Sequence, residues 1–73
     1  MLKLTEDKYN EVMHLADKFI ETYKDYRKGQ AIFNAFNMYY PEFANELRGT
    51  DDDCFYNDSK ISSFLSHVVV SPY

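Results

Sequence analysis

Residues 29–50 read GQAIFNAFNMYYPEFANELRGT, and this stretch combines a helix start, a proline break and a glycine stop. Nearly every side chain between positions 31 and 40 is apolar, and the exceptions are Asn34 and Asn37. A helix that is apolar around its whole circumference is normally buried. We therefore predict that a helix beginning just after Gly29 and ending at Tyr40 forms the centre of the fold.

The proline after this helix predicts a change of direction. Pro41 cannot continue the helix and restricts the backbone of the residue before it, but proline is favoured at the first position of a new helix. An apolar stripe at helical spacing follows, made of Phe43, Ala44 and Leu47. We predict a short third helix over residues 41–48 that ends at Gly49.

The segment before the central stretch predicts one long helix. Thr5 is a suitable N-cap, and Glu6 and Asp7 follow in the first turn, where the helix dipole favours anions. One apolar stripe is formed by Tyr9, Val12, Met13, Ala16, Phe19, Ile20 and Tyr23. We predict a helix over residues 6–28, with Gly29 in the left-handed position that ends it.

The last third of the chain predicts a loop and a fourth helix. Residues 50–58 read TDDDCFYND, a loop dense in carboxylates. Asp58 or Ser59 can cap the helix, and its apolar stripe consists of Ile61, Phe64, Leu65 and Val68. Residues 68–70 are valines, which favour a strand, but the sequence shows no evident partner strand.

Together these segments predict an all-α fold, with residues 1–73 in a single domain of about four helices. One helix is long and N-terminal, one is central and buried, and two are shorter. The predicted core consists of Val12, Ala16, Phe19, Ile32, Phe36, Leu47, Ile61, Phe64 and Leu65.

Length and charge narrow the classes of function. A chain of 73 residues forms one small domain that is marginally stable alone, so a homodimer stays open. Residues 1–37 contain six acidic and six basic side chains, whereas residues 38–73 contain six acidic and two basic ones. The net charge of −4 therefore belongs to the second half, which disfavours nucleic-acid binding there.

Cys54 is the only cysteine, so the chain has no internal disulfide. The aspartates around it disfavour a thiolate, and we predict a buried structural cysteine rather than a reactive one. The sequence has no signal-like segment and no apolar run near the roughly 20 residues that span a bilayer. We expect an intracellular protein without membrane association.

The acidic loop offers oxygen atoms to a hard cation from Asp51, Asp52, Asp53, Asn57 and Asp58. Their spacing differs from that of an EF-hand, and consecutive aspartates usually cap and solvate a turn. His14 and His67 lie far apart in the sequence, and no phosphate loop, nucleophile elbow or pair of catalytic carboxylates is visible. We therefore predict no metal, no cofactor and no enzymatic activity.

The two amides of the central helix predict a tie to a neighbouring loop. Asn34 and Asn37 are three positions apart and so lie on one face. A buried amide needs hydrogen-bond partners. We predict that one of the two hydrogen-bonds the backbone of residues 50–58.

Three runs, GQAIFNAF, PEFANELRGT and DCFYNDSKISSF, resemble a group of small phage and prophage accessory proteins that has no settled activity. The shared pattern falls here on Gly29, Gln30, Phe33, Asn34, Pro41, Arg48, Gly49, Thr50, Asp53, Cys54, Phe55, Tyr56, Asp58 and Ser59. It covers about residues 27–66. The resemblance implies a phage-encoded or phage-derived accessory protein, and it transfers no catalytic residue. We expect such a protein to lie in the cytoplasm of the host bacterium.

These observations favour a small protein-binding module of phage origin that inhibits or modulates a host factor, such as a defence system, polymerase or nuclease. The predicted acting surface combines negative charge with aromatic rings and consists of Arg48, Asp51, Asp52, Asp53, Phe55, Tyr56 and Asp58. The alternative is that both rings pack into the core while the aspartates only cap and solvate.

Two other functions stay open. One is nucleic-acid binding by an accessory protein through Lys24, Arg27, Lys28 and Arg48. The other is a structural helical unit that assembles with itself.

Overall fold

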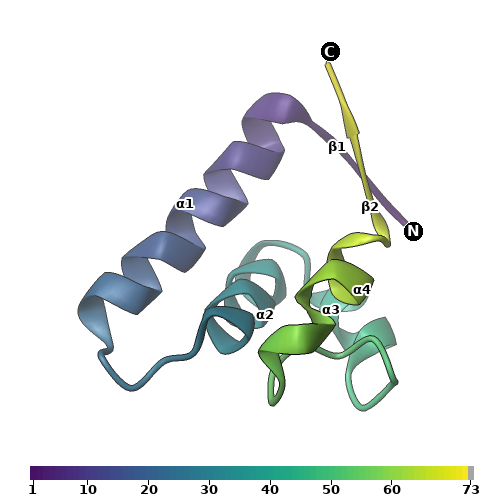
Figure 1. The fold of residues 1–73 in the computed structure, drawn as a ribbon. Coiled ribbons are helices and arrows are strands. Elements are labelled where there is room, and N and C mark those ends of the chain that lie inside the picture. The colour runs from purple at the N-terminus through teal and green to yellow at the C-terminus, as the bar shows by residue number, and fades with distance from the viewer. Residues whose placement is uncertain (73) are drawn as a thin grey trace.

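The computed structural model describes residues 1–72 and shows four α-helices with two short strands in that part of the chain (Figure 1). In chain order the elements are β1 (Leu2–Thr5), α1 (Glu6–Thr22), α2 (Lys28–Tyr39), α3 (Pro41–Leu47), a 3-10 turn (Asp58–Lys60), α4 (Ile61–Leu65) and β2 (Val68–Ser71). α2 packs against α1, α3 and the 3-10 turn, so it is the centre of the helical body.

The prediction of an all-α fold is wrong, because β1 and β2 pair as a two-stranded parallel sheet. The pairing places Leu2 opposite Val68 and Leu4 opposite Val70. Leu4 is buried whereas its neighbours Lys3 and Thr5 are exposed, which is the alternation of a half-buried strand. The fold is therefore α+β, and the partner that the valines lacked in the sequence is the segment before the first helix.

The first helix starts where predicted and ends earlier. Oγ1 of Thr5 accepts a hydrogen bond from the backbone N–H of Lys8 at 3.2 Å, which confirms the N-cap. The helix ends at Thr22 rather than at residue 28, and the chain turns through an aromatic cluster in which Tyr23 and Tyr26 stack with ring centroids 5.0 Å apart. Gly29 therefore lies in the first turn of α2 and does not end α1.

The central helix and the proline break are confirmed. Ile32, Phe33 and Phe36 of α2 are fully buried. Pro41 occupies the start of α3, and Gly49 follows with φ +77°, a left-handed backbone that favours glycine.

The core is an aromatic cluster around α2. Phe64 of α4 lies with its ring centroid 5.5–5.7 Å from the rings of Phe33, Phe36 and Phe43. The predicted core residues that are buried are Val12, Ala16, Ile32, Phe36, Leu47 and Phe64. Three others, Phe19, Ile61 and Leu65, are partly buried and pack against this core. The prediction omitted Phe33 and Phe43.

The start of α2 comes into close contact with residues 54–58. A Cβ atom at Gly29 would lie 2.2 Å from the backbone oxygen of Cys54 and 2.9 Å from Oδ1 of Asp58. Only a residue without a side chain allows the two segments to approach this closely.

We expect the Gly29→Ala variant to lose about 1–3 kcal/mol of unfolding free energy, because the added methyl group would overlap the backbone oxygen of Cys54, which cannot move aside as the Asp58 side chain can. The matched control is Gly49→Ala, which has open space around its Cβ and should lose only about 1 kcal/mol, for its left-handed backbone. Urea titrations followed by circular dichroism measure both values. A Gly29→Ala variant as stable as the unmodified protein would contradict the close contact.

Candidate partner-binding surface

The loop of residues 48–58 is held in one shape by its own polar groups. The carboxylate of Asp53 accepts from the backbone N–H of Gly49 at 2.8 Å and from that of Phe55 at 2.9 Å. The hydroxyl of Thr50 donates to the backbone oxygen of Leu47 at 2.7 Å. These bonds link the start and the middle of the loop to one another, so these backbone polar groups are satisfied by side chains of the loop itself.

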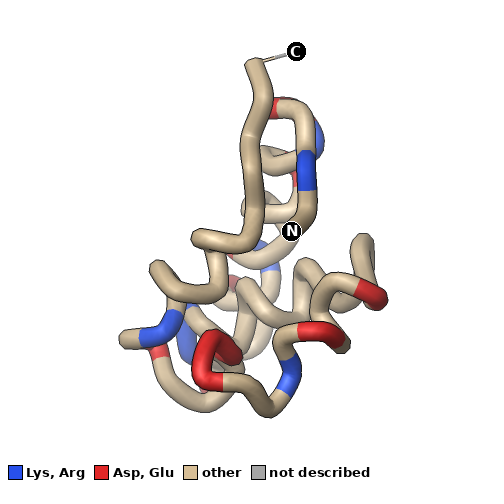
Figure 2. The backbone as a smooth tube through the Cα atoms, turned by 90° about the vertical axis from the view of Figure 1, so that its right-hand side faces the viewer, with Lys and Arg blue, Asp and Glu red and all other residues tan. Residues whose placement is uncertain are grey.

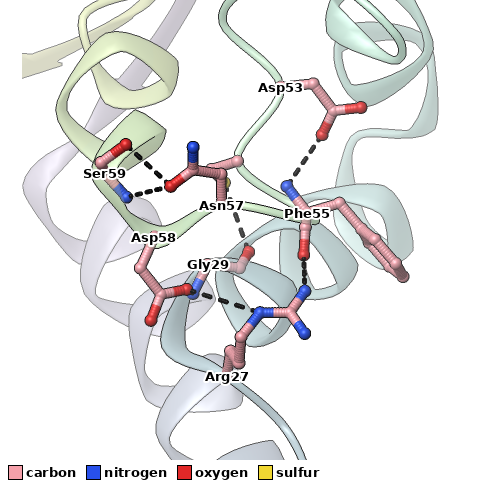
Figure 3. Close-up of polar contacts among 8 residues, drawn as sticks. Arg27, Gly29, Asp53, Phe55, Asn57, Asp58 and Ser59 are labelled. Carbon is pink, nitrogen blue, oxygen red and sulfur yellow. Dashed lines mark hydrogen bonds and ion pairs between the residues drawn. The ribbon is translucent and has the colours of Figure 1, made fainter.

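The C-terminal end of this loop is hydrogen-bonded to the start of α2 (Figure 3). Oδ1 of Asp58 accepts from the backbone N–H of Gly29 at 2.9 Å and lies 4.0 Å from Nε of Arg27. The Arg27 guanidinium also donates to the backbone oxygen of Phe55. Arg27 occupies the N-cap position of α2 without providing a capping side chain. Asp58 therefore caps this helix from a distant part of the sequence, where the dipole favours an anion.

The same junction contains the cysteine. Sγ of Cys54 donates to the backbone oxygen of Gly29 at 3.3 Å, and the side chain is fully buried. Burial, reinforced by the nearby carboxylate of Asp53, raises the pKa of the Cys54 thiol from 9.0 to about 12. The predicted buried cysteine is confirmed, and its thiol stays protonated at neutral pH.

The two aromatic residues of the loop contact each other, with ring centroids 4.7 Å apart, but they differ in burial. Phe55 is half-buried with its ring edge against Phe33, at 5.7 Å between centroids, whereas the next residue, Tyr56, is 80% exposed. The Arg48 guanidinium lies over the Phe33 ring, 5.1 Å from the ring centroid. A small hollow of about 180 Å³ is lined by Phe33, Arg48, Gly49, Asp53, Phe55 and Tyr56.

Three of the four predicted acidic residues are engaged within the fold. Asp53 and Asp58 make the bonds described above, and Oδ2 of Asp52 lies 2.7 Å from Nε2 of His67. Asp51 is exposed. The alternative interpretation, in which the aspartates cap and brace the loop, therefore describes three of the four aspartates, whereas Asp51 and Tyr56 remain exposed.

The predicted hydrogen bond from Asn34 or Asn37 to the backbone of residues 50–58 is wrong. Nδ2 of Asn34 donates to the hydroxyl of Tyr26 at 3.2 Å, and Oδ1 of Asn37 accepts from Arg48. Arg27 makes the bond to the loop backbone instead. Nothing in the sequence distinguishes Arg27 from its neighbours Lys24 and Lys28 for this role.

The structure also bears on two earlier hypotheses, a metal site in the acidic loop and nucleic-acid binding through basic side chains. Among residues 1–72, no group of three or more histidine, cysteine, aspartate or glutamate side chains has the arrangement of a metal site. Two of the four residues proposed for nucleic-acid binding, Arg27 and Arg48, direct their guanidinium groups at the protein itself.

A second concave surface was not predicted. A cleft of about 470 Å³ at the junction of α2 and α3 is lined by Met1, Leu2, Tyr39, Tyr40, Pro41, Glu42, Phe43 and Glu46. Beside it Met38 is 66% exposed. The sequence signal was the pair Glu42 and Glu46, four apart on one helix face next to exposed aromatics, but the approach of β1 to this face was needed to form the cleft.

No family model matches the chain, and no significant match to it was found among curated proteins or solved structures. Within residues 1–72, no helix combines the length and the apolar character that crossing a bilayer requires.

We expect the cysteine to make stability fall at alkaline pH. The folded state holds the Cys54 thiol neutral up to a pKa of about 12, whereas an unfolded thiol ionises from about pH 9, so its contribution is complete below pH 9 and is lost as pH rises. The unfolding free energy of the unmodified protein minus that of Cys54→Ala should be constant below pH about 8. It should fall by about 1.4 kcal/mol per pH unit above pH 9. A difference independent of pH would contradict the burial of the thiol.

We expect Asp58→Ala to lower the unfolding free energy by about 1 kcal/mol, because the N-terminus of α2 loses the carboxylate that accepts from the Gly29 N–H. Asp58→Asn should lose about half of that, since the amide oxygen still accepts from Gly29 but the charge is gone. Asp51→Ala, a change to an exposed carboxylate of the same loop, is the matched control and should change stability by less than about 0.5 kcal/mol. Equal losses for Asp51→Ala and Asp58→Ala would contradict the capping role.

Proposed function

We propose that the chain is a non-enzymatic protein-binding module that contacts its partner through the loop of residues 48–58. The observation that carries the proposal is the exposure of Tyr56, 80% of whose side chain is open to solvent on a loop that is bonded at both ends. Tyrosine is enriched among the residues that dominate binding energy at interfaces. A rigid loop loses little conformational entropy when a partner binds.

The hollow beside Tyr56 supports the same surface. Its volume of about 180 Å³ suits one side chain of a partner rather than a small-molecule ligand, whose pockets usually measure about 300–1,000 Å³. Its walls combine the rings of Phe33, Phe55 and Tyr56 with the side chains of Arg48 and Asp53. A partner side chain with an apolar body fits walls of this kind.

Charge sets the kind of partner. The excess of acidic residues lies in positions 38–73, and Asp51 is exposed within the loop. Acidic surfaces raise the association rate with basic ones. We therefore infer a partner with a basic contact surface. The resemblance to phage accessory proteins is the support for a host protein of the bacterial cytoplasm, whose activity the module inhibits or modulates.

The cleft at the α2–α3 junction is a second candidate surface for the same function. Its lining includes Tyr39, Tyr40 and Phe43 together with the carboxylates Glu42 and Glu46, so it suits a partner segment that combines apolar and basic residues. Nucleic-acid binding is less favoured, since Arg27 and Arg48 are already engaged. A salt titration on immobilised DNA or RNA tests it, because binding of that kind is lost at about 0.2 M salt.

The two protein-binding surfaces are distinguished by two single substitutions. A partner is first captured from a lysate of the host bacterium, purified, and titrated against each variant. Tyr56→Ala should weaken binding at least about 30-fold, because a dominant interface aromatic is worth about 2 kcal/mol or more. Tyr39→Ala, at a half-exposed tyrosine of the α2–α3 cleft, should leave binding unchanged. The reverse result would move the partner to the cleft, and two unaffected variants would contradict both surfaces.

A further inference from the structure

The strand pair of β1 and β2 leaves two sheet edges open, and these edges differ. Figure 2 shows the pair in front of α1, with no segment on the side of β2 that faces away from β1. A two-stranded sheet is marginal by itself, and an open edge presents unpaired N–H and C=O groups. Proteins usually protect such edges with a charged residue. Lys3 is such a residue on β1, whereas residues 66–72 contain no lysine, arginine, aspartate or glutamate.

The register shows which groups of β2 face outward. The backbone N–H of Leu2 donates to the oxygen of His67 at 2.8 Å, and Lys3 pairs with Val69. In a parallel ladder both polar groups of one residue bond to its neighbour strand, while those of the next residue point away. Val69 therefore turns its N–H and C=O toward β1. Val68 and Val70 turn theirs toward the open edge.

We propose that β2 pairs with β2 of a second copy of this chain, in antiparallel orientation about a two-fold axis at Val69. Val68 then exchanges both of its backbone hydrogen bonds with Val70 of the second copy, and Val70 does the same with Val68 of the second copy. The result is a four-stranded sheet. This inference does not depend on the proposed partner-binding loop.

Self-pairing fits this edge better than pairing with a foreign strand. The same two residues supply matched donors and acceptors on both sides, which is the condition for a symmetric interface. Val69 faces its own symmetry mate in a non-hydrogen-bonded pair, where side chains lie closest, and 39% of it is exposed in the single chain. No charge is buried, because none lies on the strand. Pairing through one short strand buries less surface area than a stable interface does, for which the lower limit is about 1,200 Å². The dimer is therefore reversible.

Sedimentation at rising concentration is the first test. From about 10 µM to about 1 mM the unmodified protein should change from the mass of one chain to that of two. Val70→Pro removes an N–H that faces the open edge and none that bonds to β1, so this variant should stay monomeric with an unchanged melting temperature. A monomer at every concentration, or a dimer that survives Val70→Pro, would overturn the proposal.

Cysteine cross-linking is the second test, and it reports the register. In Val69→Cys the two thiols face each other with Cα atoms about 4.5 Å apart, within reach of a disulfide. In Val70→Cys the symmetry-related Cα atoms are more than about 7 Å apart, too far for that bond. Under mild oxidation at about 1 mM protein, the first variant should form a covalent dimer and the second should not. The native Cys54 is buried and gives no background. Equal cross-linking of both variants would overturn the register.

Discussion

The approach of Gly29 to residues 54–58 is the contact on which the remaining structure depends. It joins the start of α2 to the loop through a close backbone approach, a thiol hydrogen bond and a carboxylate cap. Each of these interactions is modest alone, but all three meet at Gly29, with the thiol hydrogen bond buried and the carboxylate partly exposed. The loop in turn places Phe55 against Phe33 and leads into α4, whose Phe64 also contacts Phe33.

Local signals predicted the helices that depend on nearby residues. Thr5 caps α1, Pro41 starts α3 and Gly49 ends it, because each acts within one turn of its own position. Gly29 was misassigned as a helix stop. A glycine is required at position 29 because the backbone of Cys54, about 25 residues away, lies too close for a side chain. From the sequence alone, a glycine that ends a helix cannot be distinguished from one that allows such a close contact. The sheet was missed for the same reason, since Leu2–Thr5 and Val68–Ser71 lie at opposite ends of the chain.

The acidic loop shows why charge in a sequence does not identify a binding surface. Positions 51–53 are chemically identical, yet Asp53 bonds two backbone N–H groups, Asp52 contacts His67 and Asp51 is exposed. Which of three equal carboxylates remains for a partner is decided by backbone geometry over a few residues. The aromatic pair divides in the same way, because Phe55 and Tyr56 alternate between the core and solvent. Composition therefore marked the loop as acidic and aromatic, and only the fold shows which of its side chains are exposed.

The positions of the loop and the strands connect binding to assembly. In Figure 1 the strand pair lies at the upper end of the molecule, beside the start of α1, whereas the chain between α3 and α4 lies at the lower end. In the proposed dimer, pairing through β2 would therefore leave the loop of each copy accessible. Such a dimer would present two of the proposed binding loops, and a partner with two basic sites would bind the second loop as an intramolecular step. Weak self-association through one short strand is enough to raise the apparent affinity for such a partner, without any additional contact at the loop.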